Sequence, residues 1–163
     1  MTWETCLKTN AKEVVVVTDS DEIIELISNL GGSAYKSQKE HNSGTDRIQE
    51  YVEEHKFSDE ELVINVQGDE PLIDAEAINQ LGKFMMDNQF QYGTLAKKFG
   101  DDVILKDKDK VKVIVEGKKG LDFYRTNPKS PHDNSKILHH IGVYAFTAGF
   151  LNLFAKMPTS VNE

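Results

Sequence analysis

Two adjacent carboxylates follow a strongly apolar stretch near the middle of the sequence. The stretch ELVINVQ, residues 61–67, has the composition of a strand covered on both faces, and it runs into Gly68, Asp69 and Glu70. Asp69 follows this strand through a glycine, so its carboxylate is expected to project from the sheet edge, where backbone can approach a ligand closely. A carboxylate there suits Mg²⁺, which takes one or two protein oxygens and completes its shell with water and phosphate oxygens. Turn chemistry before a helix is the alternative interpretation.

A second group of polar residues stands at the predicted start of a helix. It combines hydroxyls, a flexible backbone and free helix N-terminal amides in Ser43, Gly44, Thr45, Asp46 and Arg47. Such a group suits the edge of a base or a phosphate. Ser43 followed three residues later by Asp46 resembles a capping box, so the alternative is a capped helix with Arg47 on its surface.

The second half of the chain contributes three further candidates. Arg125 ends a predicted strand, where its guanidinium could fork onto a carboxylate or phosphate, although an ordinary surface arginine is the alternative. His139 and His140 face opposite ways on a strand and therefore do not easily share one metal ion. Tyr144 lies four residues beyond His140 and so on the same strand face. A half-buried sheet surface is the alternative for His140 and Tyr144.

Alternating strands and helices position these residues. Strands are predicted at residues 14–17, 33–37 and 61–67, and they are separated by helices that begin after Asp19 or Ser20 and at Ser43. A further helix is capped by Asp74. This order predicts βαβ units and an α/β fold with a mainly parallel sheet, which binds ligands at the carboxyl ends of its strands. Residues 18–19, residues 67–69 and the loop before Ser43 all stand at such ends.

The pattern changes from about Tyr92 onward. Two short strands around Glu-Gly-Lys-Lys-Gly are predicted within VKVIVEGKKGLDFYR, residues 111–125, which indicates a hairpin. A Pro-, Asn- and Ser-rich loop follows at residues 126–136. Residues 137–146 are predicted as a strand and residues 148–157 as an amphipathic helix.

Composition limits the class of protein. A chain of 163 residues fits one domain, and 27 acidic against 19 basic residues give a net charge of −8, which argues against a nucleic-acid surface. No apolar run is long enough to cross a membrane, and residues 1–13 lack the features of a signal peptide. The single cysteine, Cys6, leaves no partner for an internal disulfide and fits a reducing compartment, so a cytoplasmic protein is expected.

Five segments, in the same order along nearly the whole chain, resemble the 3-deoxy-manno-octulosonate cytidylyltransferases, also called CMP-Kdo synthetases. They are VVVVTDSDEI, NSGTDRIQE, NVQGDEPLI, VKVIVEGKKGLDFYR and HIGVYAF with FLNLFAKMPTS. The resemblance implies a Rossmann-like nucleotidyltransferase fold, usually in a homodimer. It also implies Mg²⁺-dependent transfer of CMP from CTP to the anomeric hydroxyl of the eight-carbon sugar acid Kdo, with release of pyrophosphate, for lipopolysaccharide synthesis.

The resemblance also assigns roles by position. Asp69 would be a metal-binding and catalytic aspartate, and Gln67 and Gly68 would line the nucleotide and sugar site. Residues 43–47 would hold the cytidine end. The residues that would face the sugar acid are Gln67, Arg125, His140 and Tyr144, with Arg125 the natural partner of its carboxylate.

Residues 1–163 are accordingly expected to form one truncated domain. Residues 1–91 would be its nucleotide and metal half, and residues 92–163 its sugar-acid half. The family's N-terminal phosphate-binding loop and a second metal-binding aspartate have no counterpart in this sequence. Asp122 and Tyr124 stand where the family usually has Tyr and Ser. The isolated chain is therefore expected to be much less active than a complete family member, or inactive.

Three other interpretations stay open at this point. One is a nucleotidyltransferase for another sugar acid, such as sialic acid, on the same sheet and metal site. A second is a receiver-like signalling domain with Asp69 as phospho-acceptor, which QGDEP fits poorly. The third is a non-catalytic, nucleotide-binding remnant of the family.

Overall fold

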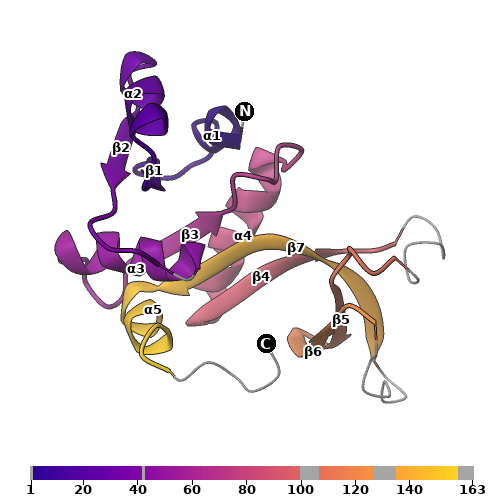
Figure 1. Ribbon diagram of the computed structural model, residues 1–163. Helices are drawn as coiled ribbons and strands as arrows, with labels where there is room; N and C mark the ends of the chain where they lie inside the picture. The colour runs from indigo at the N-terminus through magenta and orange to yellow at the C-terminus, as the bar shows by residue number, and fades with distance from the viewer. Residues whose placement is uncertain (1, 42, 100–106, 127–134, 158–163) are drawn as a thin grey trace. The chain divides into compact units, whose positions relative to one another are not determined.

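The computed structural model describes residues 2–41, 43–99, 107–126 and 135–157 (Figure 1). Most of the predicted loop at residues 126–136 lies outside these ranges. So do residues 158–160, the end of the segment FLNLFAKMPTS that resembles the family. The described chain divides into two compact units: unit 1 comprises Met1–Gly93 and Val143–Glu163, and unit 2 comprises Thr94–Gly142. Among the described residues, no helix is long and apolar enough to cross a membrane.

Unit 1 begins with a parallel strand pair and its covering helix. The β-branched run VVVT forms β1 (Val15–Thr18), which pairs in parallel with β2 (Ser33–Lys36). The connecting helix α2 (Asp21–Asn29) starts at Ser20, whose Oγ accepts from the Ile23 N–H at 3.4 Å. Gly31 follows the helix at φ +77°, a left-handed conformation that favours glycine. A short helix, α1 (Thr2–Cys6), precedes β1 and was not predicted from the sequence.

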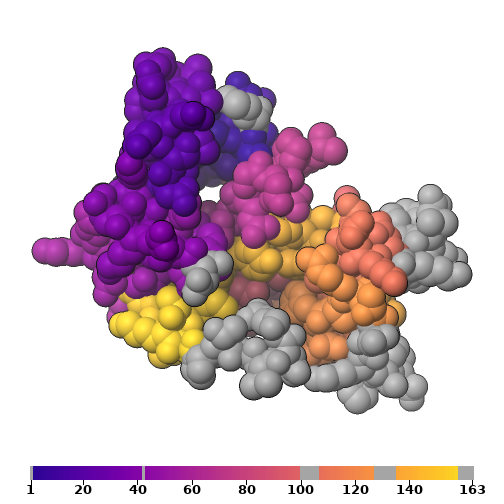
Figure 2. Space-filling view, viewed as in Figure 1, coloured from indigo at the N-terminus to yellow at the C-terminus, as the bar shows by residue number. Residues whose placement is uncertain are grey.

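The remainder of unit 1 surrounds the strand that carries the candidate carboxylates. Helix α3 (Gly44–Glu54) leads into β3 (Leu62–Val66), and α4 (Ala75–Asn88) follows with Asp74 as its N-cap. Strand β3 pairs antiparallel with β7 (Lys136–Thr147), Asn65 standing opposite Tyr144. Helix α5 (Ala148–Phe154) packs on α3, as Figure 2 shows in yellow against purple. The buried cluster at this contact consists of Val52, Phe146, Ala148 and Leu151.

Unit 2 is built on a β-hairpin. Strands β5 (Lys112–Glu116) and β6 (Lys119–Tyr124) pair antiparallel around Gly117, and β5 also pairs antiparallel with the first part of β7. Gly117 has φ +57°, which the tight turn requires. Strand β4 (Tyr92–Lys97), absent from the sequence prediction, also pairs with β7.

The structure confirms the predicted α/β class and the hairpin. The expectation of a mainly parallel sheet differs from the structure in one respect. Strand β1 pairs in parallel with β2, whereas the pairs β3–β7, β5–β6 and β5–β7 are antiparallel. The sequence pattern identified β1, β2, β3, β5, β6 and β7 and missed β4. It carried no information on the direction in which β7 returns along β3.

Candidate functional site

The carboxyl end of β3 presents Asp69 at the surface. Gln67, Gly68 and Asp69 are all exposed. The loop is held by a turn, in which the Glu70 N–H donates to the Gln67 carbonyl at 3.1 Å, and by Thr2, whose hydroxyl donates to the Gly68 carbonyl at 3.0 Å. A Cβ built at Gly68 would meet no atom within 4 Å. Asp69 is therefore exposed just beyond the end of β3, and the space beside Gly68 is open.

The donor set at this strand end fits a magnesium ion. The described residues contain no group of three or more His, Cys, Asp or Glu side chains able to hold a metal ion. Mg²⁺ does not require such a cage, because it commonly binds one or two carboxylates and completes its octahedron with water and phosphate oxygens. An exposed Asp69 offers one such hard oxygen ligand. The described part of the chain thus suits an ion that arrives with a phosphorylated substrate better than a closed structural site.

The second predicted group lies at the N-terminus of α3, where Ser43 is confirmed as the N-cap, while the Asp46 carboxylate bonds to the Ser43 hydroxyl in place of the backbone N–H of a capping box. Ser43 Oγ accepts from the Asp46 N–H at 3.1 Å, and the Ser43 hydroxyl also donates to Asp46 Oδ2 at 2.8 Å. Gly44 opens the helix with no atom near its absent side chain, and Thr45 is half-buried. The space beside Gly44 is therefore open, while the Asp46 and Arg47 N–H groups are already bonded to Ser43.

Arg47 joins this group to the end of β1. Its Nη2 donates to Asp19 Oδ2 at 2.6 Å, while its Nε is buried without a hydrogen-bond partner among the described residues. The hydrogen bond from Arg47 holds the pKa of Asp19 below its usual value. One of the three predicted strand-end segments, residues 18–19, is thus in contact with the first turn of α3. Within the described residues, no hydrogen bond or ion pair connects Asp69 to either of them.

A buried carboxylate on α3 supports this region and was missed in the sequence. Glu50 is only 7% exposed and accepts hydrogen bonds from the Gln38 N–H at 2.6 Å, from the Tyr35 hydroxyl at 3.0 Å, and from His41 Nε2. Burial raises the pKa of Glu50, but the hydrogen bonds from Gln38, His41 and Tyr35 lower it by more, to about 2. Burial and the neighbouring carboxylates of Glu54 and Glu50 raise the pKa of Tyr35, which keeps its hydroxyl a donor.

This network fixes the chain that leads into the helix start. Residues 35, 38 and 41 come just before Ser43, and all three bond to one side chain of α3. The segment is thereby tied to the helix whose N-terminus carries residues 43–47. A local sequence signal was lacking, because the partners of Glu50 lie 9, 12 and 15 residues away and one of them is a backbone N–H.

In unit 2, Arg125 and His140 have separate partners. Arg125 is exposed just after β6, and its Nη1 donates to the Asp109 carbonyl at 2.8 Å. His140 is 9% exposed, with Nε2 2.8 Å from Thr94 Oγ1 and its ring edge-on to Phe123. His139 instead stacks on Phe99, so the two histidines have different neighbours, as the strand alternation predicted. No described hydrogen bond links Arg125 to His140.

Tyr144 belongs to unit 1 and lies in the packed layer of β7. It stands opposite Asn65 of β3 and stacks on Phe146, with ring centroids 6.5 Å apart. The Asn65 side chain is buried, and its Nδ2 has no hydrogen-bond partner among the described residues. Cys6 is half-buried, and burial raises the pKa of its thiol.

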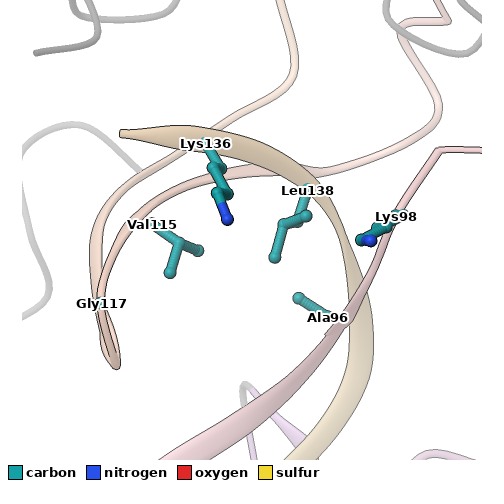
Figure 3. Close-up of a pocket in the computed structure, with 6 residues that line it drawn as sticks. All are labelled: Ala96, Lys98, Val115, Gly117, Lys136 and Leu138. Atoms are coloured by element: carbon teal, nitrogen blue, oxygen red, sulfur yellow. The ribbon is translucent and has the colours of Figure 1, made fainter. Parts of the chain in front are cut away.

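Unit 2 also contains a cavity of about 390 Å³ that none of the candidate residues lines (Figure 3). Its walls are Ala96, Lys98, Val115, Gly117, Lys136 and Leu138. Figure 3 shows the Leu138 side chain between those of Lys136 and Lys98, and the other lining residues are apolar or small. The predicted site residues therefore do not converge on this cavity.

The comparisons with known proteins agree with this fold. The family model described as cytidylyltransferase matches residues 2–163. A 3-deoxy-manno-octulosonate cytidylyltransferase of Photobacterium profundum is 32% identical over 99% of this chain and 69% of its own length. A second such relative, from Actinobacillus pleuropneumoniae, is 33% identical with the same coverage.

A solved structure gives the same result in three dimensions. It is that of a CMP:2-keto-3-deoxy-manno-octonic acid synthetase complexed with CTP, which is 29% identical and superposes with a TM-score of 0.84. The alignment covers 98% of this chain and 67% of that one. The fold is therefore that of a nucleotidyltransferase. Within that class, the chain belongs to the cytidylyltransferase family.

Proposed function

We propose that this chain carries the activity of a 3-deoxy-manno-octulosonate cytidylyltransferase, which transfers CMP from CTP to Kdo. The observation that supports this most strongly is the likeness to the CTP-complexed synthetase over 98% of the chain, together with relatives of the same name. In this reaction the anomeric hydroxyl of Kdo attacks the α-phosphorus of CTP. The bond to the bridging oxygen of pyrophosphate breaks, pyrophosphate leaves, and the hydroxyl proton passes to solvent.

The nucleotide is assigned to the strand ends of unit 1. The exposed N-terminus of α3, with residues 43–47, holds the cytidine end through backbone N–H groups and hydroxyls. Gln67 and Gly68 line the nucleotide, and the open space beside Gly68 admits it. Asp69 supplies the carboxylate for Mg²⁺, an ion that neutralises the charge of the triphosphate when it is bound.

The sugar acid is assigned to Gln67, Arg125, His140 and Tyr144. Arg125 is suited to its carboxylate, because a guanidinium binds a carboxylate through two parallel hydrogen bonds. The contact of Arg125 with the Asp109 carbonyl occupies Nη1 and leaves further donors on the fork. We further propose that the protein forms a homodimer and acts in the cytoplasm. Its product, CMP-Kdo, would serve lipopolysaccharide synthesis.

Acceptor choice tests this function. Pyrophosphate release from CTP and Mg²⁺ is measured with Kdo, with N-acetylneuraminate and without any acceptor. Release that requires Kdo supports the proposal, whereas a preference for N-acetylneuraminate reassigns the acceptor within the same family. The assay is run on this chain and on a longer chain carrying the further segments of the Photobacterium profundum relative, which this chain matches over 69% of its length. Absence of Kdo-dependent release from both contradicts the proposal.

A further inference from the structure

Lys112 is a lysine at the centre of unit 2 whose side chain is fully buried. It opens β5, the strand that pairs with both β6 and β7, and its exposed fraction is 0%. Lysine is among the residues least often buried in this way, because removing an ammonium group from water is costly unless it gains good partners. A lysine at such a position therefore needs hydrogen-bond acceptors for its ammonium group.

Those partners are backbone carbonyls. The Lys112 ammonium donates to the carbonyl of Arg125 at 2.9 Å and to the carbonyl of Asp107. No carboxylate among the described residues forms an ion pair with it. The positive charge is therefore solvated by peptide dipoles and is not neutralised by a described side chain.

Arg125 is connected to the turn at residues 107–109 in two ways, directly through its guanidinium and indirectly through Lys112. Its carbonyl accepts from Lys112, which also binds the carbonyl of Asp107, and its own Nη1 donates to the carbonyl of Asp109. Lys112 thus connects the residue after β6 to the turn at residues 107–109. The hydrogen bond from Lys112 restrains the Arg125 backbone and therefore the position from which the Arg125 side chain extends.

We propose that Lys112 is a positioning residue for Arg125, holding its backbone and adding a buried positive charge to the place where the carboxylate of the sugar acid binds. This inference rests on the proposed function, since it takes Arg125 as the partner of that carboxylate. Stability alone does not account for Lys112, because an apolar side chain of equal length would fill the site without removing a charge from water.

Two measurements on Lys112→Met test the inference, with Lys136→Met as the control. Lys136 is an exposed lysine on β7 of the same unit. Hydrogen exchange at residues 107–109 and 125–126 is expected to become faster in Lys112→Met and to stay unchanged in Lys136→Met. Steady-state kinetics are expected to show a KM for Kdo raised about tenfold, with kcat and the KM for CTP within about a factor of two.

The outcomes separate this inference from the proposed function. Unchanged exchange at both segments overturns the positioning role whether or not the protein turns over Kdo. Changed exchange with an unchanged KM for Kdo shows a structural role only and overturns the inference. If neither the wild-type chain nor its longer form shows Kdo-dependent turnover, the proposed function is contradicted. The hydrogen-exchange result alone then decides whether Lys112 positions the Arg125 backbone. If Lys112→Met does not fold, Lys112→Gln, which keeps a neutral donor, is measured in the same way.

Discussion

Glu50 in unit 1 and Lys112 in unit 2 are both charged side chains buried beside a candidate binding segment. Glu50 receives hydrogen bonds from two side chains and one backbone N–H, and they favour its charged form. Lys112 reaches only carbonyl oxygens. The carboxylate is thus matched by donors gathered from a separate segment of chain, whereas the ammonium acts as a connection between two stretches of backbone.

The difference predicts different consequences when each charge is removed. Loss of Glu50 would leave Tyr35, His41 and the Gln38 N–H without their acceptor, and this cost falls on stability. Loss of Lys112 would leave the carbonyls of Asp107 and Arg125 without this donor. It would also remove one of the two connections between Arg125 and the turn at residues 107–109. Loss of Glu50 is therefore expected to lower the free energy of unfolding of unit 1. Loss of Lys112 is expected chiefly to disturb the position of Arg125 in unit 2.

Glu50→Ala gives the largest expected effect on stability. Three donors lose a charged acceptor at a buried site, so the free energy of unfolding is expected to fall by about 3 kcal/mol. Urea denaturation followed by circular dichroism measures it. Glu60→Ala, at an exposed position, serves as the control and is expected to change it by less than about 0.5 kcal/mol. A loss for Glu50→Ala as small as that of the control would show that the network does not stabilise unit 1.

A smaller effect is expected from pH. The pKa of Glu50 lies at about 2 in the folded chain, below its ordinary value of 4.5. A lowered pKa means that the folded state binds fewer protons than the unfolded state between these values. The stability from Glu50 is therefore complete above pH 4.5 and is lost as the pH falls toward 2.

Glu50→Gln isolates this contribution, because it keeps the shape but cannot titrate. The decrease in unfolding free energy between pH 5 and pH 3 is expected to be smaller in Glu50→Gln than in the wild type, when both are measured by urea denaturation. Glu60→Gln should follow the wild-type profile. Parallel profiles for the wild type and Glu50→Gln would mean that the carboxylate titrates normally in the folded chain.

Local features of the sequence predicted the elements well. The run of valines before a capping serine predicted β1 and α2, and Ser43 and Asp74 marked the starts of α3 and α4. Gly117 and its lysines marked the hairpin. These signals act over a few residues, and the placement of Asp69 at the end of β3 follows from them.

Non-local features were not predictable in the same way. The antiparallel return of β7 along β3 joins residues about 80 positions apart, and no residue pattern encodes that direction. The burial of Lys112 depends on backbone carbonyls, which carry no residue identity. That of Glu50 depends on one backbone N–H and on two side chains 9 and 15 residues away. The roles proposed for residues 43–47, Gln67, Arg125, His140 and Tyr144 come from the family resemblance and stay predictions.

The most direct test of the central claim is Asp69→Asn in a CTP, Kdo and Mg²⁺ assay of pyrophosphate release, with Glu70→Gln as the matched neighbour. Removal of a carboxylate that holds the metal ion is expected to lower kcat/KM by about 100-fold, or about 3 kcal/mol of transition-state stabilisation. Glu70, whose backbone closes the turn, should tolerate the change to Gln with an effect of less than about threefold. Equal activity of Asp69→Asn and wild type would contradict the assignment of the metal and the phosphates to the end of β3.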